Sequence, residues 1–214
     1  MKKLVIIGAS GFGKEVAWLV ERINKVKKTW ELIGFLDDNE MLHGKKMNGY
    51  PILGECQWAI ENQEDVFVVC AIGSAKSRTK IFDKLAGVKY ATLVDPSVEI
   101  SDKTNIGEGS IICAGTIITA DITIKSHVII NLDCTVGHDT IIESYVTLYP
   151  SVNVSGNVHL EEGVEMGTGS QIIQGIKIGK GTIVGAGAVV VKELPQYCTA
   201  VGIPALAIKY NEPY

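Results

Sequence analysis

The sequence predicts a small α/β unit with a parallel sheet, followed by a parallel β-helix built from six-residue repeats. Before about residue 94, apolar strand-like segments alternate with helix-like segments. From Val94 onward, an aliphatic side chain returns at every sixth position. The chain also has 23 glycines against 6 prolines, which is typical of a fold with many tight corners.

Composition narrows the class of protein. With 214 residues, 46% of them hydrophobic and 21% charged, the chain is an ordinary globular protein. A net charge of −4 argues against nucleic acid or an anionic membrane as a partner. Five cysteines without a CxxC pair argue against a disulfide scaffold, and the apolar run Leu4–Ile7 is too short for a signal peptide. We expect a soluble, cytoplasmic protein.

The α/β unit is expected over residues 1–93 and has a Rossmann-like pattern. Its strand at 66–72 is apolar throughout, as expected for a parallel strand covered on both faces. The helix expected at 14–24 carries apolar residues on one face. The complete order is strand 3–7, helix 14–24, strand 31–36, strand 66–72, helix 75–85 and strand 90–94.

The β-helix is expected over residues 94–192. Seventeen positions from Val94 to Val190, six residues apart, hold no polar residue and show no shift of phase. One repeat supplies one short strand and one corner, and three repeats close a coil of about eighteen residues. A β-sandwich would need loops of varying length, which would break this register. Residues 193–214, which begin with a turn at Pro195, are expected to cap the open end.

Several motifs carry a resemblance to a known family. They are GASGFGKE at 8–15, FLDDNE at 35–40, AIG at 71–73, NLDCTVGHD at 131–139 and GIPA at 202–205. With the repeats, they make the chain resemble the NeuD-type sialic acid O-acetyltransferase family, which includes the PglD-type nucleotide-amino-sugar N-acetyltransferases. The resemblance implies a left-handed β-helix, a homotrimer, acetyl-CoA as co-substrate and no metal. It also implies acetyl transfer to an amine or hydroxyl of a sugar, in bacterial cell-surface glycan synthesis.

The resemblance places the general base at His138. Histidine suits this role because its pKa lies near 7, and His138 follows a core aliphatic by two residues, so it should project outward. By resemblance Asp139 holds the imidazole, and Asn131 orients the acceptor or His138. Adjacent residues on a strand point to opposite faces. Asp139 can therefore reach His138 only at a corner, or from a neighbouring subunit.

Acetyl-CoA is expected along the outside of the later coils, in a groove between subunits. By resemblance Gly156, Thr168 and Ala186 give backbone contacts to the pantetheine arm. The family commonly has a second histidine nine residues after the first, and here that position is Thr147. The Thr147 hydroxyl could still donate a hydrogen bond to acetyl-CoA.

The glycine loop Gly8–Gly13 follows a strand and opens a helix, where backbone amides favour phosphate. A Walker A pattern is incomplete because Glu15 stands where a Mg²⁺-binding hydroxyl is required, so ATP hydrolysis is not expected. A tight turn with no ligand remains the alternative.

By resemblance the same loop holds a nucleotide-sugar diphosphate. The contacts implied are Ser10, Gly11 and Phe12 at the loop, Asp37 and Asp38 at the uracil or ribose, and Gly73 closing the pocket.

Phe12 leaves the acceptor open, because the amino-sugar enzymes carry a histidine at this position. A nucleotide sugar, a free sialic acid or another small alcohol remain candidates, as do N- and O-acetylation and another acyl-CoA. A zinc hydratase of the γ-carbonic-anhydrase kind would need three converging histidines, but His127 and His138 differ in coil phase. A non-catalytic trimer is favoured by the missing histidines and opposed by the retained Asn131, His138 and Asp139.

Overall fold

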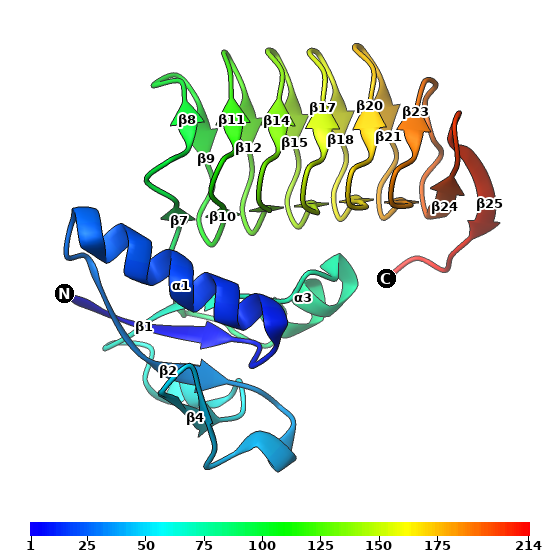
Figure 1. The fold of residues 1–214 in the computed structure, drawn as a ribbon. Helices are drawn as coiled ribbons and strands as arrows, with labels where there is room; N and C mark the ends of the chain where they lie inside the picture. The colour runs from blue at the N-terminus through cyan, green and yellow to red at the C-terminus, as the bar shows by residue number, and fades with distance from the viewer.

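The computed structural model describes residues 1–214 and shows the two expected parts (Figure 1). The N-terminal unit is a six-stranded sheet in the order β3-β4-β2-β1-β5-β6, parallel except for the β3–β4 pair. Its elements are β1 (Lys2–Ile7), α1 (Gly11–Val26), β2 (Trp30–Leu36), η1 (Glu40–Leu42), β3 (Lys46–Met47), β4 (Tyr50–Gly54), α2 (Trp58–Glu61), β5 (Phe67–Cys70), α3 (Ala75–Phe82) and β6 (Lys89–Tyr90).

The central strand β1 explains why this unit forms. It pairs in parallel with β2 on one side and with β5 on the other. Leu4 and Ile6 pack into a cluster on one face of the sheet, and Val5 and Ile7 into a cluster on the other. The predicted strands and helices are present with shifted ends. The strand expected at 90–94 divides in two: β6 joins this sheet, whereas β7 begins the β-helix. The segments β3, β4 and α2 were not expected.

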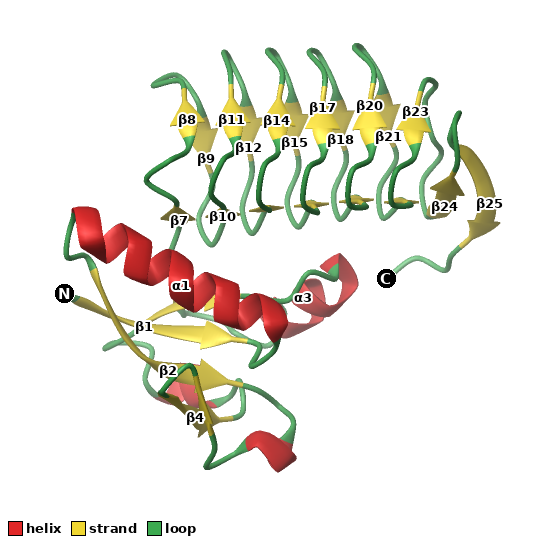
Figure 2. Ribbon diagram, in the orientation of Figure 1, coloured by secondary structure: helices red, strands yellow, loops and turns green.

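The β-helix is confirmed as a left-handed parallel β-helix, and its short strands alternate with loops at every corner (Figure 2). Each strand from β7 to β23 is two residues long and ends on a predicted aliphatic position. The strands are β7 (Leu93–Val94), β8 (Glu99–Ile100), β9 (Asn105–Ile106), β10 (Ile111–Ile112), β11 (Ile117–Ile118), β12 (Thr123–Ile124), β13 (Ile129–Ile130), β14 (Thr135–Val136), β15 (Ile141–Ile142), β16 (Thr147–Leu148), β17 (Asn153–Val154), β18 (His159–Leu160), β19 (Glu165–Met166), β20 (Gln171–Ile172), β21 (Lys177–Ile178), β22 (Ile183–Val184) and β23 (Val189–Val190).

Each strand pairs with the strand one coil later, eighteen residues along the chain, as in Ile112, Ile130 and Leu148. The coils therefore build three sheets. The first sheet contains β7, β10, β13, β16, β19 and β22; the second runs from β8 to β23 and the third from β9 to β21. Val94 and Ile100 are only half-buried, because no coil covers the first one.

The corners have a period of their own. From Gly109 to Gly187, every sixth residue has a positive φ. Half of these residues are glycine, for which this backbone region has no steric cost. The other corners carry Asp121, His127, Asp133, Asp139, Tyr145, Ser151 and Asn157. The side chains at these seven corners are therefore held in the left-handed region by the coil itself.

The C-terminal segment extends and closes the β-helix. β24 (Cys198–Val201) pairs in parallel with β22 and places Cys198 and Ala200 in the core, so the first sheet continues beyond residue 192. β25 (Leu206–Tyr210) then pairs antiparallel with β24 at the far end of the coils (Figure 1). None of the helices is both long and apolar enough for a transmembrane segment.

The N-terminal unit packs against the first sheet. Val16 of α1 belongs to the same buried cluster as Ile111 and Ile129, which point outward from β10 and β13. Two arginines tie the parts together: Arg22 of α1 bonds the Asp95 carboxylate with two nitrogens, and Arg78 of α3 reaches the β16 region.

An aromatic cluster seals the junction at the end of α3. The His127 ring stacks on Phe82 at 4.0 Å and on Tyr145 at 5.3 Å, with Tyr90 edge-on at 4.7 Å. Burial lowers the pKa of His127 to about 4 from its usual 6.5. The folded protein therefore holds this imidazole neutral.

This burial predicts a pH dependence of stability. Between pH 6.5 and about 4, His127 is protonated in the unfolded chain but stays neutral in the folded protein. The free energy of unfolding therefore falls as the pH falls through this range. We expect a slope of at most about 1 kcal/mol per pH unit, because solvent screens part of the effect. In urea titrations His127→Phe should flatten this slope and His159→Gln should keep it. An unchanged slope in His127→Phe would show that other groups cause the acid sensitivity.

Candidate active site

The proposed base and its acidic neighbour meet at the corner between the second and third sheets. His138 Nδ1 lies 2.7 Å from Asp139 Oδ2, and the two side chains are 56% and 61% exposed. Asp139 has a φ of 59°, so the chain turns between them. Asp139 therefore reaches His138 of its own chain, and the contact does not need a neighbouring subunit. A carboxylate only accepts, so Nδ1 donates, and in the neutral imidazole Nε2 then carries the lone pair.

Gly156 lies directly beneath the His138 ring, one coil further along. A Cβ at Gly156 would lie 2.5 Å from His138 Nε2 and 2.6 Å from Cε1. The backbone N–H of Gly156 makes no hydrogen bond. Glycine at this position therefore leaves room for the imidazole and keeps a free donor beside it.

Asn131 lies at a different corner, between the first and second sheets. Its side chain is buried, and its Oδ1 accepts from Leu132 N at 2.7 Å. It lines a cleft of about 320 Å³ between the first sheet and the N-terminal unit, which we call the junction cleft. The lining residues are Phe12, Glu15, Gly73, Ser74, Ile129, Asn131, Thr147, Tyr149 and Pro150. The cleft thus joins Phe12 and Gly73 to Asn131, but His138 does not line it.

The glycine loop combines structural and open positions. A Cβ at Gly13 would lie 2.1 Å from Gly8 O, and Gly8 itself has a φ of 102°. These two glycines are required by the tight strand-to-helix turn. A Cβ at Gly11 would meet nothing within 4 Å, and Ser10 is exposed at the N-cap of α1 without a side-chain capping bond. Ser10 and Gly11 therefore border open space at a helix N-terminus.

The two carboxylates after β2 hold backbone amides. Asp37 Oδ2 accepts from Ala9 N at 2.8 Å, which ties it to the glycine loop, and Asp38 Oδ1 accepts from Cys56 N at 2.8 Å. Each carboxylate keeps further lone pairs for another donor.

Thr147 lies at the junction between the two parts, which the sequence did not indicate. Its side chain is 1% exposed, and its hydroxyl donates to Gly73 O at 2.7 Å and accepts from Arg78 at 2.9 Å. The hydroxyl is thus committed to the junction and is not free to donate to acetyl-CoA. Thr168 and Ala186 are exposed at the corner between the first and second sheets.

Three polar residues at the junction were not anticipated: Arg78, Tyr149 and Glu165. Tyr149 OH lies 3.1 Å from Glu165 Oε2, and Glu165 Oε1 accepts from the first amide of α3 at 2.9 Å. The sequence contained one indication that Arg78 is buried. It lies three residues after Ala75 and four before Phe82, a spacing that puts all three on the buried face of α3.

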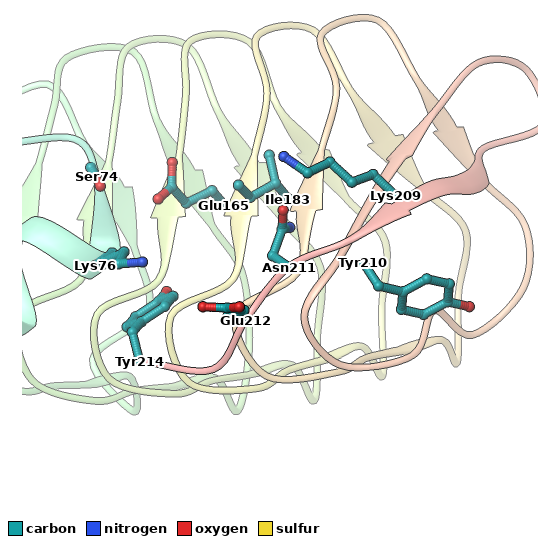
Figure 3. A pocket seen from close by; sticks show the side chains of 10 residues that line it. Ser74, Lys76, Glu165, Ile183, Lys209, Tyr210, Asn211, Glu212 and Tyr214 are labelled. Carbon is teal, nitrogen blue, oxygen red and sulfur yellow. The ribbon is translucent and has the colours of Figure 1, made fainter.

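A larger cavity of about 430 Å³ lies beyond Glu165, between the start of α3 and the C-terminal tail (Figure 3). It contains none of the residues expected at the active site. Cys134 is buried in the core, which raises the pKa of its thiol to about 11, so it is not a nucleophile. No cluster of three or more His, Cys, Asp or Glu side chains in the chain is arranged to hold a metal ion.

A left-handed β-helix with an exposed histidine–carboxylate pair at one of its corners is the arrangement expected of an acyltransferase. The comparisons agree with this class. The model of the PglD N-terminal domain matches residues 3–85. A comparison with curated proteins gives no match.

Three solved structures resemble the chain over almost its whole length. The acetyltransferase domain of PglB from Neisseria gonorrhoeae FA1090 is 34% identical, with a TM-score of 0.88 over 97% of this chain and 100% of that one. WeeI from Acinetobacter baumannii AYE is 34% identical, with a TM-score of 0.86 over 97% and 100%. PerB from Caulobacter crescentus is 30% identical, with a TM-score of 0.86 over 98% of both chains. The chain belongs to the PglD-type family of nucleotide-amino-sugar N-acetyltransferases, as its motifs predicted.

The contact between Gly156 and His138 makes a testable prediction. In Gly156→Ala the added methyl group would push the imidazole away from its position, while the exposed ring can yield without unfolding the coil. We expect the free energy of unfolding to stay within about 1 kcal/mol and the acyl-transfer rate to fall at least about tenfold. Urea unfolding and a thiol-release assay measure the two effects. A fully active Gly156→Ala enzyme would exclude this ring position from catalysis.

Proposed function

We propose that this chain transfers an acetyl group from acetyl-CoA to the amine of a nucleotide-linked amino sugar, with His138 as general base. The observation that carries the proposal is the 2.7 Å hydrogen bond between His138 Nδ1 and Asp139 at an exposed corner. With Nδ1 engaged in this way, Nε2 of the neutral imidazole has its lone pair available to accept a proton. The relatives support the reactants: the PglB domain is also solved with acetyl coenzyme A, and PerB with CoA and GDP-perosamine.

The reaction needs no covalent enzyme intermediate. The sugar amine attacks the thioester carbonyl, a C–N bond forms, and His138 Nε2 takes the proton from nitrogen. The C–S bond then breaks, and the imidazolium returns the proton to the departing CoA sulfur. Asp139 stabilises the imidazolium meanwhile. We assign the N–H of Gly156 to the oxygen of the tetrahedral intermediate, because it makes no hydrogen bond within the chain and Gly156 is the residue packed beneath the His138 ring.

The acceptor is assigned to the N-terminal unit and the junction cleft. The exposed helix start at Ser10 and Gly11 suits a diphosphate, since its amides carry partial positive charge. The sugar would then enter the junction cleft toward Asn131. Phe12 gives this cleft an apolar wall where the amino-sugar enzymes have a polar donor, so we expect a sugar with an apolar group at that point.

We further propose that the enzyme works as a homotrimer. On one chain, His138 and Gly156 stand at the corner between the second and third sheets. Asn131, Thr168 and Ala186 stand at the corner between the first and second sheets. A neighbouring copy, related by a threefold axis, would bring the first corner to the second and form a groove for CoA between them.

The role of His138 is tested by thiol release from acetyl-CoA with a panel of UDP- and GDP-linked 4-amino sugars, sialic acid and simple amines. We expect release with an amino-sugar nucleotide, at least about a thousandfold slower in His138→Ala and about tenfold slower in Asp139→Asn. Binding of CoA by His138→Ala should persist in calorimetry. His43→Ala, which changes a histidine away from this corner, should keep full activity.

The alternatives give different results. Release with sialic acid alone would identify an O-acetyltransferase, and CoA binding without release from any acceptor would refute the proposed acceptor class. An unchanged rate in His138→Ala would refute the assignment of the base.

A further inference from the structure

The Arg78 side chain, 1% exposed, is a cation buried between α3 and the first sheet. Its two terminal nitrogens carry four N–H groups and lie within hydrogen-bond distance of five neutral oxygens, so one N–H is shared. These bonds join two segments far apart in sequence. The acceptors are the carbonyls of Ile72 (2.8 Å), Gly73 (2.7 Å), Tyr145 (2.5 Å) and Val146 (3.3 Å) and the hydroxyl of Thr147 (2.9 Å).

Arginine is a costly residue for this position. No carboxylate pairs with Arg78, its Nε has no partner, and burial lowers its pKa. An aliphatic side chain would fill the same space without that desolvation cost. Arginine instead provides directional hydrogen bonds, because its planar guanidinium group presents N–H donors in a fixed fork. The fork fixes the loop after β5 relative to the coil at Tyr145–Thr147.

Side chains of the β-helix also bind the loop after β5. Thr147 and Glu165 occupy successive rungs of the first sheet. Thr147 bonds Gly73 O, and Glu165 bonds Ala75 N. In Figure 3, Glu165 extends from its strand on the side of Ser74 and Lys76. Residues 73–75 are thus held by side chains from two rungs and, from behind, by Arg78.

Gly73 and Ser74 form one wall of the junction cleft, and Asn131 lies on the wall contributed by the coil. We propose that Arg78 is a positioning residue for the acceptor: it sets the distance between the Gly73–Ser74 wall and the Asn131 wall. The inference rests on the proposed function, in that the acceptor occupies this cleft. Arg78 itself, buried behind Gly73, does not line the cleft.

Arg22 provides a matched control. It also joins the two parts, through Nε at 2.5 Å and a terminal nitrogen at 2.9 Å from the Asp95 carboxylate. It lies at the first coil, and neither Arg22 nor Asp95 lines the junction cleft. Phe12 and Glu15 lie at the other end of α1, and Arg22 makes no hydrogen bond to the Gly73–Ser74 wall. Loss of Arg22 therefore loosens the junction without removing any bond that holds this wall.

The test compares Arg78→Met, Arg78→Lys and Arg22→Met in steady-state kinetics. We expect Arg78→Met to raise the KM for the acceptor about tenfold or more, with kcat and the KM for acetyl-CoA within about threefold. Lysine can donate to fewer of the acceptors, so Arg78→Lys should recover only part of the affinity. Arg22→Met should keep the acceptor KM within about twofold. An equal rise of the acceptor KM in Arg78→Met and Arg22→Met would show that Arg78 contributes only to general stability, and would overturn the proposal.

Hydrogen exchange gives a readout that does not depend on the acceptor. The amide of Ala75, which donates to Glu165, should exchange faster in Arg78→Met and unchanged in Arg22→Met. This result would hold even if no nucleotide sugar were acetylated, so failure of the proposed function and failure of this inference can be told apart. If Arg78→Met does not fold, Thr147→Val removes one bond to Gly73 and should change exchange in the same direction. Unchanged exchange in the folded variant would contradict the proposal.

Discussion

The stacking of each coil on the previous one, eighteen residues along the chain, is the constraint on which this structure depends. It keeps the aliphatic side chains in buried rows, from Ile112 through Ile130 to Leu148. It also fixes what stands on the outside, because every corner residue lies above the residue eighteen positions later. The placement of His138 over Gly156 is the consequence that bears on the proposed catalysis: the ring has room only because the next coil has no side chain there. The same stacking turns Asp139 into the left-handed corner from which it reaches His138.

The α/β unit adds the second half of the site, and its placement depends on polar contacts as well as on apolar packing. Val16, Ile111 and Ile129 bury the contact, but apolar contacts tolerate small shifts. The hydrogen bonds of Arg78, Thr147 and Glu165 are directional, and they converge on the loop that borders the junction cleft. The proposed base thus stands on a rigid corner of the coils, and the proposed acceptor wall on a loop held against those coils. A reaction that needs two substrates aligned to within a fraction of an ångström benefits from both.

The sequence predicted the β-helix well because its repeat leaves no alternative register. It also predicted the strands β1, β2 and β5 from their apolar runs, α1 from its apolar face, and α3 from the alternation of strands and helices. It missed β3, β4 and α2, because segments of two to five residues show no period of their own. It merged β6 with β7, because two adjacent strands in different sheets look continuous in sequence. The His138 motif was visible from a resemblance. The roles of Thr147 and Arg78 were not, since they depend on contacts between residues about seventy positions apart.

The central claim is that catalysis requires the His138 corner of one chain and the junction cleft of another. It is tested most directly by co-expressing His138→Ala and Asn131→Ala chains, each of which should be inactive alone. In a cyclic trimer every mixed assembly contains one interface with both residues intact, so a random mixture should regain about a quarter of the wild-type thiol-release rate. If both residues acted within a single chain, no mixed assembly would contain a complete site. Activity no higher than that of either parent would then contradict the account.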